Sequence, residues 1–422
     1  GFNSYSAVSP NLVAPYQYLL NMSVARPLAA KMTLEVGYVG RLSHKSLLRT
    51  DYGQPLTRFT DQASGQNWMQ AMGKLRDIFE SGVTAAQVKA NPSLVPAIPF
   101  IENIFPGAKN DKITGSASAN YFNNVYGVYA QSDLDALQDY DRVKRADGRC
   151  IAVYGCNTFF PQQQSGLLTW TNAGTGSYHG MQIVLRRPVQ KGWGFDFNYT
   201  WSHAIDNASA SESNASTIQD SFCPKCFRGP SDFDIRHNIT ANTVFELPFG
   251  KGKKFAGNSN KWLDGLIGGW QISALVSYRT GTPVSLSNGG IYPTNYLNAA
   301  LAVLRPGATM PTTGVTLNQN GNPSLFANTT DYKAFMGQYP GTVGTRGIIR
   351  LPNVRNTDLS IGKYFKMPWE GHTLQVRGEA FNAFNFVNFT GFQGSIQSQA
   401  TFGQFSSTQD PRVMQFALRY EF

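Results

Sequence analysis

The chain has 422 residues, of which 41% are hydrophobic and only 15% charged, and its formal net charge is +10. It contains no apolar run approaching the roughly 20 residues that a transmembrane helix needs, which excludes a helical membrane protein. The basic residues are scattered singly or in pairs, and the one dense cluster, GKGKKF at 250–255, is short. We therefore expect no nucleic-acid binding.

Nine segments of about ten residues alternate apolar with polar side chains, which is the period of a β-strand. In chain order they are LLNMSVA at 19–25, MTLEVGYVG at 32–40, MQIVLRR at 181–187, GFDFNYTWSH at 194–203, NITANTVFEL at 238–247, WQISALVSYR at 270–279, NTDLSIGKYF at 356–365, HTLQVRGEAF at 372–381 and RVMQFALRYEF at 412–422. They predict an all-β protein whose strands each have one apolar and one polar face.

The connections between these segments fall into two alternating sets. The short ones are RPLAAK after 25, PVQKGW before 194, the PFGKGKKF stretch and KMPWEGH. The long ones span about 43–175, 204–235, 285–350 and 385–410. A soluble β-sandwich would also alternate along its strands, but tight turns at one rim and large loops at the other are typical of an up-and-down outer-membrane barrel. The pattern predicts about nine to ten antiparallel transmembrane strands of a larger barrel, with long extracellular loops that carry short helices.

In that barrel the apolar face meets lipid and the polar face meets a wet lumen. The residues that we expect on the lipid side are Phe195, Phe197, Tyr199, Trp201, Phe416, Leu418, Tyr420 and Phe422. Those that we expect on the lumen side are Arg279, Arg377, Glu379, Arg419 and Glu421. The lumen residues either contact a plug or form a ladder of crossing charges that stabilises the barrel.

Aromatic residues gather toward the ends of the predicted strands. They are Tyr16, Tyr38, Trp193, Tyr199, Trp201, Trp270, Tyr278, Tyr364, Trp369 and Tyr420. Together with the loop asymmetry, this favours the aromatic girdles of a membrane barrel over the ordinary enrichment of aromatic residues in strands.

Two stretches stand out in the long loops. QNWMQAMGKLRDIFESG at 66–82 places Trp68, Met72, Leu75 and Phe79 at helical spacing. This predicted helix either covers the pore as a lid or packs its loop against neighbouring loops, and packing is the commoner role. FNAFNFVNF at 381–389 either stacks on a sugar ring or belongs to the outer girdle.

The four cysteines form two local pairs in turn-rich segments, Cys150 with Cys156 and Cys223 with Cys226. In an oxidising compartment each pair is expected to close a loop as a disulfide. CPKC at 223–226 also has the spacing of half a zinc site or a redox motif, but the sequence supplies neither a second half-site nor a thioredoxin-like context.

Catalysis finds little support, and we expect neither an enzyme nor a cofactor or metal. The five histidines show no metal-ligand spacing, and no nucleophile elbow or phosphate-binding loop is present. Asp206 lies near His203 and Asp234 near His237 in the sequence. Since both pairs fall where strands meet a long loop, they are better explained as hydrogen-bonded rim residues than as catalytic dyads.

Five longer phrases carry a resemblance to a known family. They are YHGMQIVLRRPVQKGWGFDFNYTWSHAIDNAS, SDFDIRHNITANTVFELPFGKGKKF, GWQISALVSYRTGTPVSLS, LPNVRNTDLSIGKYFKM and LQVRGEAFNAFNFVNF. In this order they resemble the TonB-dependent receptor barrels of the Oar-like kind, from about Pro15 to Phe422. That family's fold is a barrel of about 22 strands filled by an N-terminal plug and often preceded by a β-sandwich domain. Neither is recognisable here, so residues 1–422 are expected to be the C-terminal portion of the barrel.

The resemblance implies an outer-membrane receptor that imports a nutrient such as a siderophore, cobalamin, a glycan or a peptide. Its implied partners are outer-membrane lipid, the missing plug and strands, the TonB complex through the missing N-terminus, and the barrel assembly machinery at the C-terminal strand. Two alternatives stay open: a non-transporting outer-membrane adhesin or structural barrel, and a secreted soluble β-sandwich lectin whose apolar faces form a closed dry core.

Overall fold

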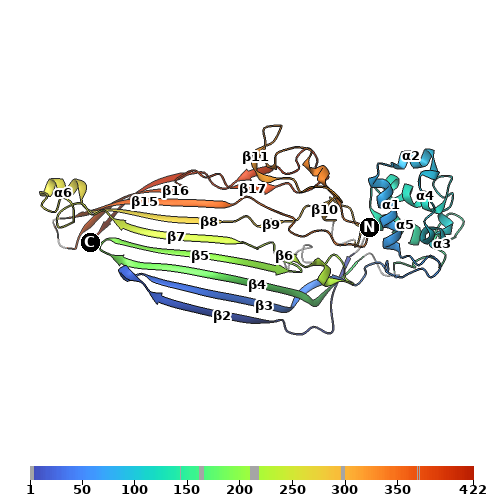
Figure 1. Cartoon of the computed structure of the whole chain (residues 1–422), viewed down its shortest axis with the longest axis horizontal. Helices are drawn as coiled ribbons and strands as arrows, with labels where there is room; N and C mark the ends of the chain where they lie inside the picture. Colours follow the sequence, from blue (N-terminus) through green and yellow to red (C-terminus); the bar gives the residue numbers. More distant parts are fainter. Residues whose placement is uncertain are drawn as a thin grey trace.

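The computed structural model describes residues 4–142, 144–160, 166–209, 218–295, 300–367, 369 and 371–422. Its main feature is a long antiparallel sheet of nine strands, which lie side by side in the order of the chain (Figure 1). The nine strands are β2 (Tyr16–Pro27), β3 (Thr33–Asp51), β4 (Gly166–Gln190), β5 (Trp193–Asp206), β7 (His237–Glu246), β8 (Trp270–Arg279), β15 (Val354–Lys366), β16 (Thr373–Phe381) and β19 (Val413–Glu421). They coincide with the nine predicted segments, which confirms the all-β antiparallel prediction.

The sheet is open rather than closed into a barrel. Among the described residues, β2 pairs only with β3, and β19 pairs only with β16. Two short strands join the sheet beside this path: β1 (Ser4–Val8) runs parallel to β4, and β6 (Gly229–Pro230) pairs with β5. The two long edges therefore present unpaired backbone hydrogen-bonding groups.

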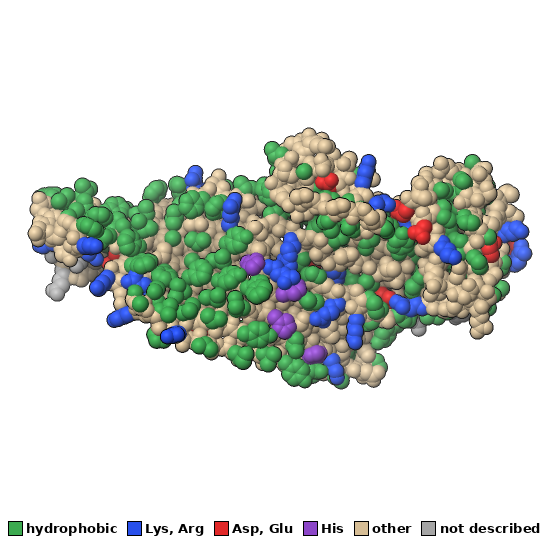
Figure 2. All heavy atoms as spheres, viewed as in Figure 1, with side chains coloured by type: hydrophobic (Ala, Val, Ile, Leu, Met, Phe, Trp, Pro, Cys, Tyr) green, Lys and Arg blue, Asp and Glu red, His purple; other side chains and the backbone are tan. Residues whose placement is uncertain are grey.

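The register of the strands joins their apolar sides into one continuous face. Phe197 on β5 lies opposite Leu185 on β4 and Ala241 on β7. The side chains of this face are not covered by a second layer, since Trp201 is 53% exposed and Phe416 is 87% exposed. Figure 2 shows hydrophobic side chains spread over the strands on the visible face. A β-sandwich would bury such a face in a dry core, so the sandwich alternative is wrong for this sheet.

The two ends of the sheet differ as the sequence predicts. The C-terminus lies at the short-turn end, where the connections are 28–32, 191–192, 247–269 and 367–372 (Figure 1). Lys191 and Gly192 both have positive φ, which suits the two-residue turn of a hairpin. The connections at the opposite, long-loop end are 52–165, 207–236, 280–353 and 382–412. Of the described helices, none is long and apolar enough to cross a bilayer.

The β3–β4 connection folds into a helical unit at the long-loop end. Its helices are α1 (Trp68–Glu80), α2 (Ala85–Ala90), α3 (Pro99–Ile104), α4 (Ala117–Asn123) and α5 (Asp133–Arg142), with short helical turns η2 (Pro92–Leu94), η3 (Pro106–Ala108) and η4 (Asn124–Val128). Asn67 caps α1, because its side chain accepts from the Gln70 N–H at 3.0 Å and the Gln70 side chain accepts from the Asn67 N–H at 2.9 Å.

The predicted helix at 66–82 is therefore present as α1. Its Trp68, Met72 and Leu75 are fully buried in the core of the helical unit, and Phe79 stacks on Tyr126 with ring centroids 4.3 Å apart. Of the two roles left open for this helix, packing within its loop is the one that the structure shows.

The β8–β15 and β16–β19 connections form a second loop body with its own buried cluster. This cluster includes Leu286, Phe326, Phe335, Phe402 and Phe405. Its short elements are β9 (Pro283–Val284), β10 (Ala302–Leu304), β11 (Thr313–Leu317), β12 (Pro323–Phe326), η7 (Asp331–Ala334), β13 (Phe335–Gly337), β14 (Ile349–Arg350), β17 (Phe389–Phe392) and β18 (Phe405–Thr408). The two largest buried hydrophobic clusters of the described chain thus lie in the loops and not in the sheet.

Candidate functional site at the long-loop end

Polar contacts dock the helical unit against the other loops. Arg305 forms an ion pair with Glu80 of α1, and the Tyr339 hydroxyl donates to Asp77 at 2.8 Å. Arg58, which precedes α1 in the β3–β4 connection, forms an ion pair with the buried Asp220 of the β5–β7 connection. Segments far apart in the sequence are thereby held as one assembly over the end of the sheet.

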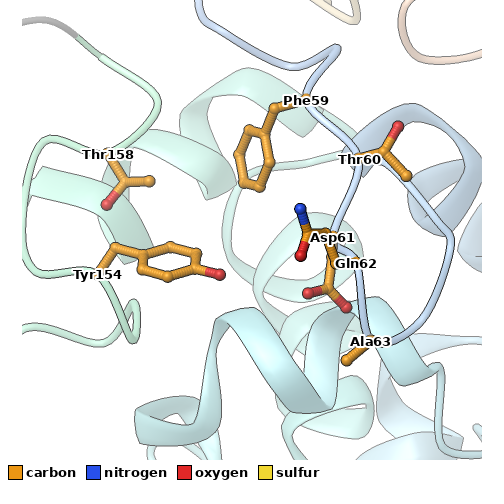
Figure 3. Close-up of a pocket in the computed structure, with 7 residues that line it drawn as sticks. All are labelled: Phe59, Thr60, Asp61, Gln62, Ala63, Tyr154 and Thr158. Atoms are coloured by element: carbon orange, nitrogen blue, oxygen red, sulfur yellow. The ribbon is translucent and has the colours of Figure 1, made fainter.

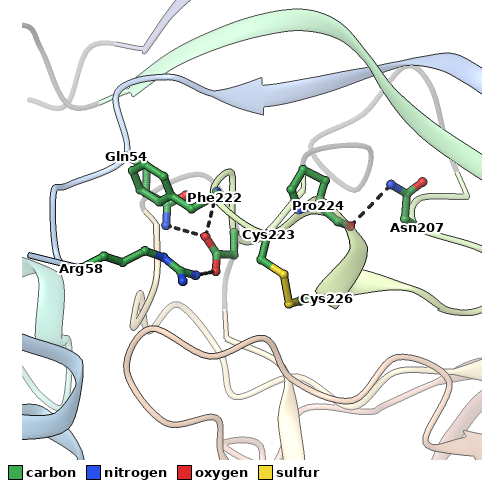
Figure 4. Close-up of a disulfide and its surroundings, with 8 residues drawn as sticks. Gln54, Arg58, Asn207, Phe222, Cys223, Pro224 and Cys226 are labelled. Atoms are coloured by element: carbon green, nitrogen blue, oxygen red, sulfur yellow. Dashed lines mark hydrogen bonds and ion pairs between the residues drawn. A yellow bond between two sulfur atoms is a disulfide. The ribbon is translucent and has the colours of Figure 1, made fainter. Parts of the chain in front are cut away.

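A disulfide lies beside the Arg58 contact (Figure 4). Cys223 and Cys226 are bonded across the turn η6 (Pro224–Phe227), with Cα atoms 5.4 Å apart. The Pro224 carbonyl accepts from the Asn207 amide at 3.5 Å. Cys150 and Cys156 form a second disulfide, with Cα atoms 5.2 Å apart. Both separations are usual for disulfides, and both bonds join the pairs that are adjacent in the sequence.

A cavity of about 590 Å³ opens on the helical unit (Figure 3). It is lined by Phe59, Thr60, Asp61, Gln62, Ala63, Tyr154 and Thr158. Tyr154 is 66% exposed and stands in the loop that the Cys150–Cys156 disulfide closes. Phe59 packs on Phe159 with ring centroids 5.1 Å apart, so one wall of the cavity is rigid and apolar.

Buried carboxylates fix the walls of this cavity. Asp61 accepts from the Asn103 amide at 3.0 Å and from the Ser64 N–H at 2.9 Å, and these hydrogen bonds hold the pKa of its carboxyl below the usual range. Asp141 of α5 accepts from three successive backbone N–H groups, at 158, 159 and 160, at 2.8 to 3.0 Å. The cavity offers two aromatic rings with hydroxyl, amide and carboxylate groups, which suits a small polar ligand that has a flat apolar side.

The predicted lumen residues share the polar face of the sheet. Gln375, Arg377 and Glu379 lie opposite Arg419, Ala417 and Gln415. Arg279 lies opposite Asn238 of β7, on the same face. The ion pairs run mainly along single strands, with Arg377 Nε 3.1 Å from Glu379 Oε1 and Arg419 Nη2 2.8 Å from Glu421 Oε1. Arg186 and Asp196, at 2.6 Å, form a pair that crosses between strands.

The predicted lipid-side residues of β5 and β19 share the opposite, apolar face. Tyr364 departs from the expected girdle, because its hydroxyl donates to Gln271 at 3.0 Å on the polar face. In the FNAFNFVNF stretch, Phe384 and Val387 are exposed, and the Arg355 guanidinium lies 4.5 Å from the Phe386 ring centre.

The histidines near the long-loop end have other partners than their sequence neighbours. His203 Nδ1 lies 3.0 Å from Asp234, whereas Asp206 pairs with Arg346 at 2.8 Å. The Tyr199 hydroxyl lies 2.9 Å from Nδ1 of His237. Antiparallel pairing brings Tyr199 of β5 beside His237 of β7, whereas Asp234 and Arg346 reach their partners from the long loops.

Asp234 is fully buried at the centre of this cluster. Arg236 lies 3.3 Å away, Arg350 contacts the same oxygen, and the Ala204 N–H donates at 2.7 Å. Burial acts to raise the pKa of this carboxyl, but the hydrogen bonds from Ala204, His203 and Arg350 outweigh it and lower the pKa. The arrangement clamps loop to strand.

Comparison with known proteins identifies the family. The sequence matches the family described as outer membrane beta barrel domain over residues 2–415. No curated protein matches the sequence.

Solved structures to which this chain is similar include the outer membrane transporter YddB from Escherichia coli, with 10% identity and a TM-score of 0.42. The match covers 100% of this chain and 34% of YddB. The ferric-catecholate import receptor Fiu from E. coli K12 has 8% identity and a TM-score of 0.36, and the match covers 99% of this chain and 29% of Fiu. FpvA of P. aeruginosa has 8% identity and a TM-score of 0.34, and the match covers 95% of this chain and 27% of FpvA. The chain therefore spans about a third of these proteins or less. With the family match extending over nearly its whole length, this chain belongs to the outer membrane β-barrel family and lies in the bacterial outer membrane.

Proposed function

We propose that this chain forms part of the wall and the extracellular loops of a TonB-dependent receptor that takes up a nutrient ligand. The observation that carries the proposal is a sheet with one apolar and one charged face, open at both edges and covered at one end by a large folded loop assembly. In this proposal the apolar face of β5 and β19 meets lipid, and the face with Arg279, Arg377 and Glu379 lines the lumen.

The open edges support a larger barrel. All twelve residues of β2 are exposed, and β19 lacks a second neighbour in the described structure. Unpaired strand edges are not tolerated in lipid, because their N–H and C=O groups have no partners there. Further strands must therefore complete the wall, and outer-membrane barrels of about 22 strands have a plugged lumen. We infer that residues 1–422 are the C-terminal portion, and that the plug and any β-sandwich domain belong to the rest of a longer protein.

The loop assembly supports ligand capture. Binding residues commonly sit on loops that a rigid scaffold positions. Here the assembly is rigid, because two buried clusters, two disulfides and the Arg58 and Arg305 ion pairs hold it together. The cavity between Phe59 and Tyr154 is a place for first contact with a siderophore, cobalamin, glycan or peptide. Uptake would then require the TonB complex acting on the plug, and insertion would require the barrel assembly machinery acting at β19.

Whole-cell uptake tests this function. Cells that carry the full-length gene product are given a ferric siderophore, cobalamin, labelled oligosaccharides and labelled peptides in turn, with and without a protonophore. We expect one ligand class to accumulate inside energised cells and only to bind at the surface of de-energised cells. Equal binding with and without the protonophore, and no accumulation, would identify a non-transporting adhesin or structural barrel instead.

A further inference from the structure

The connection between β7 and β8 stands apart from the other turns at the short-turn end. It spans 247–269 and carries the helix α6 (Lys261–Ile267), which Asn260 caps by accepting from the Leu263 N–H at 2.8 Å. Gly250 has φ of +109°, and a side chain there would meet the backbone of Gly268 at 2.8 Å. A close-packed backbone thus holds α6 against the ends of the strands.

The outer side of α6 is apolar and uncovered. Trp262 is 90% exposed, and Leu263 and Leu266 are exposed beside it. Large apolar side chains that project together from a short helix mark an interaction surface. A helix with this apolar side and lysines around it is typical of segments that lie in the membrane interface.

A cavity of about 850 Å³ lies between α6 and the ends of the strands. Lys251, Lys253 and Lys261 line it together with the rings of Trp270 and Phe365. Lys363 also lines it and is only 4% exposed, with its ammonium group 5.1 Å from the centre of the Trp270 ring and in contact with the Gly268 carbonyl. The cavity therefore combines ammonium groups with apolar walls.

The position of the cavity connects it to the apolar face of the sheet. Lys363 lies opposite Trp270 of β8 and Val376 of β16, so it marks the point where the apolar face reaches the short-turn end. The four lysines that line the cavity, 251, 253, 261 and 363, outnumber its two carboxylates, Glu246 and Asp264, by two charges. The two tightest turns at the same end add Lys31 and Lys191.

We propose that 247–269 binds the anionic headgroup of a phospholipid from the periplasmic leaflet. The short turns of an outer-membrane barrel lie on the periplasmic side, where this segment meets the headgroups. Lysine ammonium groups bind phosphate as point charges, and tryptophan settles at the boundary between headgroups and acyl chains. Of the cavity lysines, Lys253 pairs with Glu246 at 3.0 Å and Lys363 donates to the Gly268 carbonyl, so Lys251 and Lys261 hold the phosphate. Trp270 and Phe365 contact the first part of the acyl chains, and Trp262 and Leu266 anchor α6 in the interface.

Lipid retention by the full-length gene product in detergent tests this site. Native mass spectrometry compares phosphatidylglycerol with the zwitterionic phosphatidylethanolamine on the wild type and on the double variant Lys251→Gln/Lys261→Gln. Both side chains are exposed, so the variant is expected to fold. We expect the wild type to prefer phosphatidylglycerol and the double variant to bind it about 25-fold more weakly, at about fivefold for each lysine.

The matched control is Lys74→Gln/Lys89→Gln, which removes two exposed charges from the helical unit at the opposite end. It should bind phosphatidylglycerol like the wild type. In a second measurement, phosphatidylglycerol with brominated acyl chains should quench part of the tryptophan emission, and Trp262→Phe should reduce that part, because Trp270 still contacts the chains. Equal retention of the two lipids by the wild type, or an equal loss in the control variant, would overturn the proposal and leave the receptor function untouched.

Discussion

An arginine placed on either side of one central strand should have opposite consequences. Phe197 and Asn198 are neighbours on β5, but Phe197 lies on the apolar face and Asn198 on the polar face. Phe197 is four residues from both Trp193 and Trp201, which is roughly 13 Å along the strand in each direction. If these two tryptophans mark the two interfaces, Phe197 lies near the middle of the bilayer.

Phe197→Arg should therefore destabilise the barrel by about 2–4 kcal/mol, the cost of an arginine at the bilayer midplane. Asn198→Arg should change the free energy of unfolding by less than about 1 kcal/mol, because the lumen is wet. The assay is denaturant unfolding of the full-length protein in phospholipid vesicles, followed by the gel shift of the folded form. Equal costs for the two variants, or a larger cost for Asn198→Arg, would refute the assignment of the faces.

Three further predictions concern the loops. Burial raises the pKa of Asp133 to about 7 despite Arg76 at 3.9 Å, so the folded state keeps a proton that the unfolded chain loses near pH 3.8. The helical unit should therefore lose stability, by at most about 4 kcal/mol, as the pH rises from 3.8 to about 7. Hydrogen exchange measured from about pH 4 to 8 should show this loss in the wild type and not in Asp133→Asn. Asp234→Ala should lower the free energy of unfolding by about 2–4 kcal/mol in denaturant unfolding. This is less than the cost of breaking a fully buried pair, because His203, Arg236 and Arg350 are partly exposed and regain water. A cost near zero would show that the cluster does not clamp the loop. Thiol titration of the denatured, unreduced protein should find no free thiol among the four cysteines, and two or more titrating thiols would contradict the disulfides.

The sheet could be predicted from the sequence because its information is local. Alternation over ten residues identifies each strand, and the lengths of the connections identify the two ends, so all nine strands agree with the structure. Among the short connections, 247–269 is longer than expected and carries the helix α6, which the sequence pattern did not indicate. The same alternation is a weaker guide at strand ends, where Tyr364 lies on the polar face and Lys363 on the apolar one.

The loop assembly could not be predicted because its contacts are not periodic. Phe105, Tyr121 and Phe159 meet in the core of the helical unit, with ring centroids 5.2 and 5.5 Å from that of Phe105, but no local pattern links them. The cavity likewise joins Phe59 to Tyr154 across most of the helical unit. The helix α1 could be predicted, because its apolar residues recur every three or four positions.

The central claim, that this chain is part of an outer-membrane receptor barrel, is tested most directly by the complete gene product separated into outer-membrane and soluble fractions. Its migration on a gel is compared with and without boiling. We expect the protein in the outer membrane and a shift on boiling, because a closed barrel resists detergent until it is heated. A soluble protein that migrates identically in both lanes would contradict the account.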